Sequence, residues 1–188
     1  HDYEVILNDE EVDIVAEVMG GVNPAYSFVK SALEHGKNVC TSNKELVATY
    51  GTELLAIAEE KNVNYLFEAS VGGGIPVIRP LSRCLAANNI TRIAGILNGT
   101  TNYMMSKMYN ENADYDAVLK EAQDCGYAER DPSADVEGHD ACRKIAILSS
   151  IISGKTVDFE DIYTEGITEV TLEDIQYAKA LDMKIKLL

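Results

Sequence analysis

Apolar residues in the early part of the chain alternate between two patterns. Short apolar runs at Asp13–Gly20, Asn38–Thr41 and Val63–Ser70 have the length and composition of buried strands. Between these runs, residues 23–36 and 44–62 carry apolar side chains at helical spacing. The order strand, helix, strand, helix, strand is typical of right-handed crossovers, and it predicts a parallel sheet.

The pattern changes after Gly74. The elements expected beyond it are a helix over 75–89, a strand over 90–99, two helices between 101 and 124, a helix over 138–153, a strand over 161–167, a further helix and a final strand over 184–188. Thr171 and Asp174 have the spacing of a capping box at the start of the last helix. This mixture predicts a second domain of the α+β type.

No predicted strand leads into the G-x-G-x-x-G loop of a dinucleotide fold, and the glycine cluster VGGGIP follows the third strand. We therefore interpret residues 1–70 as the C-terminal part of a doubly wound, Rossmann-like nucleotide-binding domain, and we expect its first half upstream of His1. Residues 71–188 form the second domain in this interpretation, and the apolar end KIKLL predicts that it continues. The fold class expected for the chain is α/β.

Charge and composition restrict the possible partners. A formal net charge of −15 disfavours nucleic acid, which binds to cationic surfaces. The sequence has neither an apolar run of about eighteen residues nor a secretory signal, so we expect a cytoplasmic protein without a membrane span. The four cysteines are widely separated and form no zinc-binding motif, which fits reduced thiols.

The most unusual segment is GYAERDPSADVEGHDACRK, which gathers acidic residues ahead of an apolar helix. It does not fit a calcium-binding EF-hand loop, because counting from Asp131 puts Ser133 at position 3 and Val136 at position 6, where a carboxylate or amide and a glycine are required. A solvated acidic loop that caps the helix is one reading of this segment.

A second reading gives the segment a chemical role. Asp140 and Lys144 are four residues apart, so they share one face of the predicted helix beside apolar neighbours. A lysine that is desolvated or close to another cation can have its pKa lowered from about 10.4 towards neutrality, which makes it a usable acid and base. Spacing alone favours an ordinary surface ion pair over this chemical role.

Three further stretches allow both a functional and a structural reading. Lys44 follows the second strand, at the edge of the sheet where ligands bind, but lysines are also common at helix starts. The triplet Gly72–Gly74 suits a ligand, a cation or a hinge between domains. Asn98 and Gly99 suit either a turn with a helix cap or a substrate-binding corner.

Taken in order, the stretches TSNKEL, EASVGGGIPVI, GILNGTTNYM and GYAERDPSADVEGHDACRKIAIL closely resemble the homoserine dehydrogenase family. The likeness covers nearly the whole chain, and the last stretch is the most specific. Members of this family interconvert L-homoserine and L-aspartate 4-semialdehyde with NAD or NADP, in the biosynthesis of threonine, methionine and isoleucine. The resemblance therefore implies an oxidoreductase that uses NADP or NAD.

The resemblance also implies roles for individual residues. Lys144 matches the general acid/base of the family, and Asp140 is placed to hold the substrate hydroxyl or the lysine. Lys44 matches a second lysine, which lies between cofactor and substrate. The substrate-binding residues implied in the same way are Glu129, Asp135, Thr100 and Tyr127.

Other positions match contacts of the family with its cofactor, a cation and a second subunit. Gly20, Thr41 and Lys44 fall where the chain passes the cofactor. A monovalent cation such as Na⁺ is implied at the backbone carbonyls of Glu68, Val71, Gly73 and Ile75. The second domain carries the subunit contact of the family, which implies a homodimer.

Two alternatives to this function stay open at this point. The chain can be a non-catalytic module for amino-acid binding or dimerisation, or part of an oxidoreductase that acts on another semialdehyde. The sequence does not choose between NAD and NADP, because the residue that discriminates between them in a dinucleotide fold is expected upstream of His1.

Overall fold

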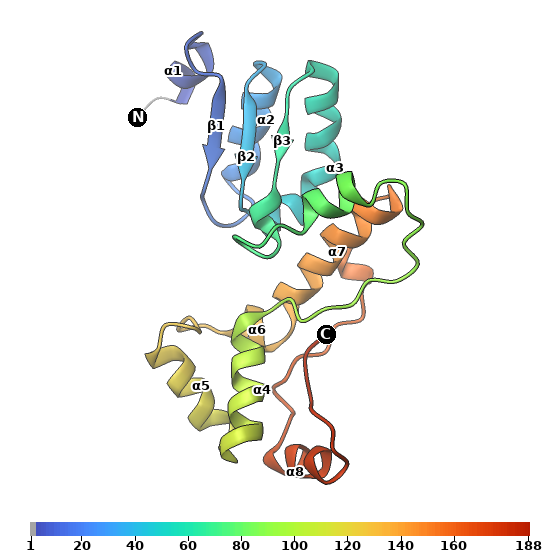
Figure 1. Ribbon diagram of the computed structural model, residues 1–188. Coiled ribbons are helices and arrows are strands. Elements are labelled where there is room, and N and C mark those ends of the chain that lie inside the picture. The colour runs from blue at the N-terminus through green and yellow to red at the C-terminus, as the bar shows by residue number, and fades with distance from the viewer. Residues whose placement is uncertain (1–2) are drawn as a thin grey trace. The chain divides into compact units, whose positions relative to one another are not determined.

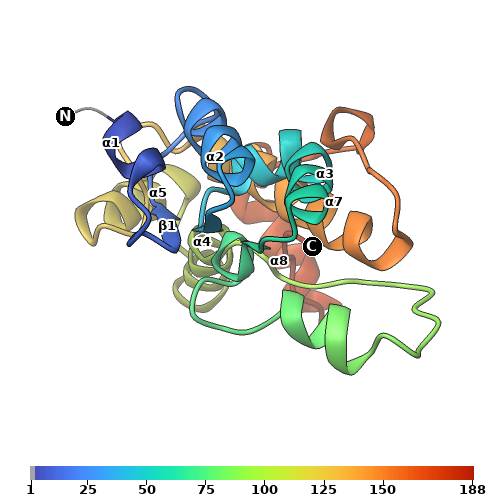
Figure 2. The same cartoon turned by 90° about the horizontal axis from the view of Figure 1, so that it is seen from above.

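The computed structural model describes residues 3–188, which Figures 1 and 2 show in two views. The chain folds into two compact units. The sheet unit contains the residues up to Thr91 together with Ala146–Asp161, and the helical unit contains Arg92–Ile145 and Ile162–Leu188. The domain boundary expected after residue 70 stays a prediction, because compactness alone does not define a domain.

A three-stranded parallel sheet forms the centre of the sheet unit, which confirms the α/β class and the parallel pairing predicted from the sequence. Its strands, in spatial order, are β1 (Ile14–Glu17), β2 (Asn38–Thr41) and β3 (Tyr65–Leu66). In the register of the sheet Glu17 lies beside Thr41, and Val39 lies beside Tyr65. The carboxyl ends of the strands therefore meet at one edge, where open α/β sheets bind ligands.

Helices cover one face of this sheet (Figure 2). The helices that precede and connect the strands are α1 (Tyr3–Asn8), α2 (Ala25–Glu34) and α3 (Lys44–Lys61). Val39 and Tyr65 are buried on the covered face, whereas Ile14 and Leu66 on the opposite face are 65% and 60% exposed. The alternation of burial along the strands follows from this one-sided covering.

Polar side chains fix the start of two helices. Asn43 caps α3, because its side-chain oxygen accepts the backbone N–H of Leu46 at 3.1 Å. Thr171 and Asp174 form the predicted capping box at the start of α8 (Leu172–Ala180). In both places the local sequence is sufficient to locate the helix start.

The third strand is shorter than the predicted run Val63–Ser70. Only Tyr65 and Leu66 pair with β2, and the 3₁₀ turn η1 (Glu68–Ser70) follows. The Glu68 carboxylate accepts the backbone N–H groups of Val77, Ile78 and Arg79 at 2.6, 2.9 and 2.7 Å. These bonds close a loop that turns the chain away from the sheet, which periodicity in the sequence does not reveal.

The helical unit packs around a methionine-rich core. Its helices are α4 (Gly99–Glu111), α5 (Tyr115–Asp124), α6 (Ser133–Val136) and α8, together with the first part of α7 (His139–Ser153). Met104, Met105 and Met108 of α4 are fully buried against Val118 of α5 and Ile175 of α8. Within residues 3–188, no helix has the length and apolar character needed to cross a bilayer.

Several elements predicted for the second half are not formed. The helix expected over 75–89 is reduced mainly to the π turn η2 (Pro80–Cys84). The segments 90–98, 161–167 and 184–188 contain no strand, although strands were predicted there, and a short 3₁₀ turn η3 (Phe159–Asp161) lies ahead of the second. A strand needs a neighbour to pair its backbone groups, and within the described chain these apolar segments have none.

The hydroxyl of Tyr65 has no hydrogen-bond partner in the described part of the chain, although the side chain is buried. Burial raises the pKa of Tyr65, and the negative charge of Glu17 adds to the shift. Because the folded pKa lies above the unfolded value, the stability linked to Tyr65 is present at neutral pH and is lost as the pH rises above about 10.

We therefore expect Tyr65→Phe to leave the free energy of unfolding at pH 7 unchanged or to raise it by about 1 kcal/mol, and to reduce the alkaline loss of stability. Urea unfolding at pH 7 and at a pH above about 10 measures both effects on the free energy of unfolding. Tyr103→Phe is the matched control, because the Tyr103 hydroxyl donates to Glu121 at 2.8 Å and its removal should cost about 1 kcal/mol. A loss of more than about 2 kcal/mol in Tyr65→Phe would contradict the expectation.

Candidate active site

An aspartate and a lysine one turn apart on α7 form an ion pair. Asp140 Oδ2 accepts a hydrogen bond from Lys144 Nζ at 2.6 Å. Asp140 is only 2% exposed, and the side chain of Lys144 is 17% exposed. Asp140 lies in the first turn of α7, where the helix dipole stabilises a negative charge. The spacing seen in the sequence therefore produces a largely buried pair rather than a surface pair.

A second bond fixes the direction of the lysine. Lys144 Nζ donates to the backbone carbonyl of Leu97 at 2.8 Å. An ammonium group carries three protons, so the two bonds described leave one proton for a further acceptor. Lys144 is thus a hydrogen-bond donor whose position is set by one charged and one neutral acceptor.

Asn98 connects the ion pair to a second carboxylate. Its side-chain amide donates to Asp135 Oδ1 at 2.7 Å and to Asp140 Oδ2 at 2.8 Å. Its side-chain oxygen accepts the backbone N–H and the hydroxyl of Thr101 at 2.8 and 2.9 Å, which makes Asn98 the N-cap of α4. Of the two readings of Asn98 left open by the sequence, the helix cap is confirmed, and the substrate-binding corner stays a prediction.

We call Asp135, Asn98, Asp140 and Lys144 the acid–lysine cluster. It combines one cation with two carboxylates, and the amide of Asn98 bridges the carboxylates without adding charge. Such an arrangement can deliver a proton from Lys144 to an oxygen atom, while the carboxylates attract a cationic group of the same ligand. All four residues belong to the helical unit.

Of the other predicted substrate residues, Thr100 and Tyr127 are linked to each other. The Thr100 hydroxyl donates to the Tyr127 carbonyl at 2.7 Å, and the Tyr127 ring lies 4.9 Å from that of Tyr103. Glu129 is exposed, and its backbone carbonyl accepts a bond from Gln123 at 3.1 Å. The structure thus brings Asp135, Asp140 and Lys144 into one cluster, whereas no bond described for residues 3–188 joins Glu129 to it.

A buried polar network occupies the carboxyl edge of β1 and β2 in the sheet unit. Glu17 Oε2 accepts the Thr41 hydroxyl at 2.5 Å, and Thr41 Oγ1 accepts the backbone N–H of Asn43 at 2.9 Å. The Asn43 amide donates to the Gly21 carbonyl at 2.6 Å. The network joins the loops that follow the two strands, at the edge where the family resemblance implies a cofactor contact for Thr41.

The predicted cofactor positions Gly20 and Lys44 flank this network. An added Cβ at Gly20 would meet no atom within 4 Å, whereas the next residue, Gly21, has φ +73°, a conformation that favours glycine. The turn therefore requires Gly21, which the sequence analysis did not single out. Lys44 is the first residue of α3 and is half-buried.

The loop predicted to bind a cation is held by its own backbone. Gly72 and Gly73 have φ +83° and +57°, and a Cβ at Gly72 would lie 2.9 Å from the Ile75 carbonyl oxygen. Oxygen atoms of backbone carbonyls are hard ligands that suit a cation such as Na⁺, so the residue types present fit such a group. Within residues 3–188, no cluster of three His, Cys, Asp or Glu side chains is placed to hold a metal ion.

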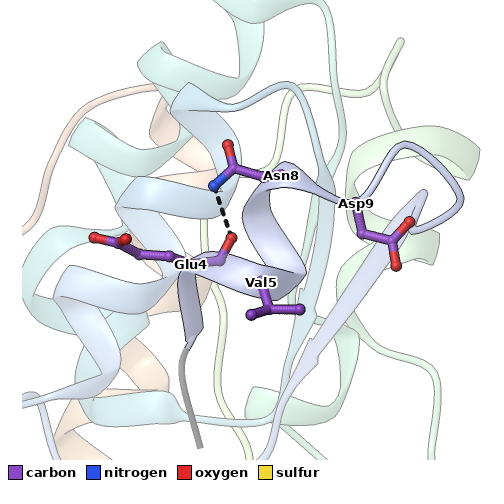
Figure 3. A pocket seen from close by; sticks show the side chains of 4 residues that line it. All are labelled: Glu4, Val5, Asn8 and Asp9. Carbon is purple, nitrogen blue, oxygen red and sulfur yellow. Dashed lines mark hydrogen bonds between the residues drawn. The ribbon is translucent and has the colours of Figure 1, made fainter.

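A surface pocket on α1 lies among Glu4, Val5, Asn8 and Asp9 (Figure 3). Its one hydrogen bond drawn there runs from the Asn8 side chain to the Glu4 carbonyl at 2.9 Å, within the helix itself. The pocket contains neither a lysine nor any residue predicted for the site. It therefore has no ammonium group like that of Lys144 in the acid–lysine cluster.

Two protein-family models together match nearly the whole chain. Residues 76–188 match the family model described as homoserine dehydrogenase, and residues 1–68 match the model described as homoserine dehydrogenase, NAD binding domain. The chain belongs to the homoserine dehydrogenase family. The resemblance seen in the four sequence stretches is thereby confirmed.

Homoserine dehydrogenases from two bacteria show how much of the family the chain represents. The enzyme of Synechocystis sp. is 51% identical over 187 residues, which cover 100% of this chain and 43% of the relative. That of Bacillus subtilis is 49% identical over 183 residues, which cover 97% of this chain and 42% of the relative. The chain therefore spans less than half the length of these relatives.

Solved structures of homoserine dehydrogenases share the fold. The enzyme from Thiobacillus denitrificans matches with a TM-score of 0.95 and 49% identity, covering 99% of this chain and 43% of that one. A hyperthermophilic archaeal homoserine dehydrogenase in complex with NADPH matches with a TM-score of 0.83 and 34% identity, covering 90% of this chain and 52% of that one. The second of these relatives binds NADPH.

Three residues of the polar networks, Asn98, Glu17 and Asn43, were not predicted as site residues. Asn98 was noted only as a cap or corner, although its position between an apolar run and Thr100-Thr101 was a usable signal. Glu17 carried a weaker signal, a single carboxylate inside the apolar run of the first strand. Each becomes significant only when the fold supplies its partners from residues more than twenty positions away.

Because Asn98 both caps α4 and bridges two aspartates, we expect its removal to lower the stability of the protein. Asn98→Ala takes away the cap of α4 and an amide donor of both aspartates, so we expect the free energy of unfolding to fall by about 2–4 kcal/mol in urea denaturation. Asp114→Ala is the matched control, because the Asp114 carboxylate caps α5 by accepting the Ala117 N–H at 2.9 Å and should cost about 1 kcal/mol. Equal losses in the two variants would mean that Asn98 acts only as a cap.

Proposed function

We propose that the protein to which this chain belongs catalyses the NAD(P)-dependent interconversion of L-homoserine and L-aspartate 4-semialdehyde. Family membership and two relatives of that name at about 50% identity support this activity. Because the chain spans less than half of those relatives, the proposal concerns the full-length protein. Within the chain, the observation that carries the proposal is the buried ion pair of Asp140 and Lys144.

In this proposal Lys144 is the general acid/base. Reduction of the aldehyde adds a hydride to the carbonyl carbon, and the carbonyl oxygen then takes a proton to become a hydroxyl. The ammonium form of Lys144 provides that proton, and the bonds to Asp140 and Leu97 hold the group in place while it does so. In the oxidising direction the neutral amine takes the hydroxyl proton back. Asp140 positions Lys144, and Asn98 positions Asp140.

The remaining predicted residues complete a pocket for an amino acid. Asp135 and Glu129 supply negative charge for the substrate ammonium group, and Thr100 and Tyr127 line the pocket in this proposal. The bond from Asn98 supports the assignment of Asp135, because it ties this carboxylate to the same cluster as Lys144. The clustering of negative charge around one lysine suits a ligand that carries both an ammonium and an oxygen atom.

NADP or NAD is the proposed cofactor, and Gly20, Thr41 and Lys44 are the proposed contacts. The match of residues 1–68 to an NAD-binding domain and the archaeal relative with NADPH support it. The carboxyl edge of the sheet also fits such a group, because the turn at Gly21 and the start of α3 bring backbone groups to this edge. When bound, the nicotinamide supplies or accepts the hydride.

Removal of the proposed acid gives the direct test. In the full-length protein, Lys144→Ala should lower kcat for homoserine oxidation by about 10²-fold or more, because positioned proton transfer contributes on this scale. Circular dichroism and thermal unfolding establish that the variant folds. Lys120→Ala is the matched control, since Lys120 is exposed on α5 and lies outside the cluster, and its kcat should equal that of the wild type.

Turnover of Lys144→Ala at the wild-type rate would remove Lys144 from the mechanism. Calorimetric binding of L-homoserine by a full-length protein that shows no cofactor-dependent turnover would favour a non-catalytic binding module. A faster reaction with a different semialdehyde in a substrate panel would place the protein in another class of oxidoreductase.

We also propose a bound monovalent cation at the carbonyls of Glu68, Val71, Gly73 and Ile75, and a homodimeric assembly. The loop conformation at the glycines supports the cation, and the family resemblance supports both. We expect sedimentation of the full-length protein to give the mass of two protomers, and its Tm to be higher in NaCl than in choline chloride of equal ionic strength. A single-protomer mass would exclude the dimer, and equal Tm values would count against the cation.

A further inference from the structure

Glu17 is a buried carboxylate that the proposed mechanism does not use. It is the last residue of β1 and is 4% exposed. Its Oε1 accepts the Met19 N–H at 2.6 Å, and its Oε2 accepts the Thr41 hydroxyl at 2.5 Å. Both oxygen atoms act as acceptors, as an ionised carboxylate does.

No ion pair described for residues 3–188 includes Glu17. Its two described donors are neutral, so no hydrogen bond or ion pair described for residues 3–188 supplies a cation to balance the buried negative charge. Burial of a charge in this way costs free energy, and an apolar side chain of similar volume would usually be more stable at such a position. The two hydrogen bonds hold the loops, but the stability of the fold gives no reason for the negative charge itself.

The position of Glu17 gives a reason for the charge. The network from Glu17 through Thr41 and Asn43 to the Gly21 carbonyl ties together the loops after β1 and β2. These loops form the carboxyl edge of the sheet, where a nucleotide binds in folds of this type. The charge thus lies at the edge that is proposed to receive the nicotinamide.

Thr41 cannot use its hydroxyl proton for the cofactor, because it gives that proton to Glu17. Its Oγ1 also accepts the Asn43 N–H. The hydroxyl is therefore a link between Glu17 and the start of α3, and a contact from Thr41 to a cofactor comes more readily from its backbone. The polar atoms of this edge act as one unit with Glu17 at its buried end.

We propose that Glu17 is a positioning residue of the cofactor site, and that its uncompensated charge makes the site prefer the oxidised nicotinamide over the reduced one. The inference rests on the proposed NAD(P)-dependent function. The oxidised ring carries a positive charge and the reduced ring is neutral. A buried carboxylate, little screened by water, attracts the first and leaves the second nearly unaffected.

Binding constants of the two cofactor forms test this without any measurement of turnover. Calorimetry on the full-length protein gives Kd for the pair that the wild type binds more tightly, either NADP⁺ and NADPH or NAD⁺ and NADH. Glu17→Gln keeps the size of the side chain and removes its charge. We expect it to weaken the oxidised form about 3- to 10-fold more than the reduced form.

Two variants that keep the charge are the controls. Glu17→Asp shortens the side chain, and Thr41→Val removes the hydroxyl that Glu17 holds. Each should change the two Kd values by a similar factor, because a loss of positioning affects both forms alike. A residue with only a structural role would give this parallel change in Glu17→Gln as well, and that result would overturn the inference.

Glu17→Met carries the same test if Glu17→Gln does not fold, because it replaces the charge with an apolar side chain of similar length. Failure of both neutral variants to fold would show a purely structural role and would also overturn the inference. A wild-type protein that binds neither cofactor form would refute the proposed function and the inference together. Wild-type cofactor binding with an unchanged ratio in Glu17→Gln would refute the inference alone.

Discussion

A carboxylate can remain charged inside a protein only when hydrogen-bond donors surround it, and this constraint shapes the helical unit. Asp140 meets it with two donors from different parts of the chain, the ammonium of Lys144 and the amide of Asn98. The start of α7, the start of α4 and the segment ahead of α4 must therefore keep their positions for the pair to exist. The position of the Lys144 side chain therefore follows from the hydrogen bonds that the buried Asp140 carboxylate requires.

Glu17 in the sheet unit and Asp140 in the acid–lysine cluster differ in the groups that surround their buried negative charge. Asp140 has a cation on the next turn of its own helix, so its charge is balanced locally. Glu17 has neutral donors among its described hydrogen bonds, and no described ion pair includes it. One carboxylate holds a lysine that we propose as the proton donor, and the other is proposed to attract a cationic ligand.

The sequence predicted those features that depend on local pattern. The parallel order of the strands follows from the alternation of strand and helix patterns along the first part of the chain. The extent of α3, the start of α8 and the shared face of Asp140 and Lys144 follow from spacing between nearby residues. What it missed depends on partners remote in sequence. The third strand ends just before Glu68, whose carboxylate accepts three backbone N–H groups about ten residues later. Strands were wrongly predicted in apolar segments such as 90–98, because a strand pattern does not reveal whether a neighbouring strand exists.

Asn98 has one more consequence, which concerns chemical ageing. An asparagine followed by glycine is the dipeptide most prone to deamidation, since the glycine nitrogen can attack the side-chain amide with little steric hindrance. In this protein Asn98 is 5% exposed, its side-chain amide is hydrogen-bonded at both its oxygen and its nitrogen, and Gly99 is already held in the first turn of α4. The hydrogen bonds that arrange the acid–lysine cluster thus also protect the Asn98 amide from deamidation. Deamidation here would set a third carboxylate beside Asp135 and Asp140, and like charges at that distance repel.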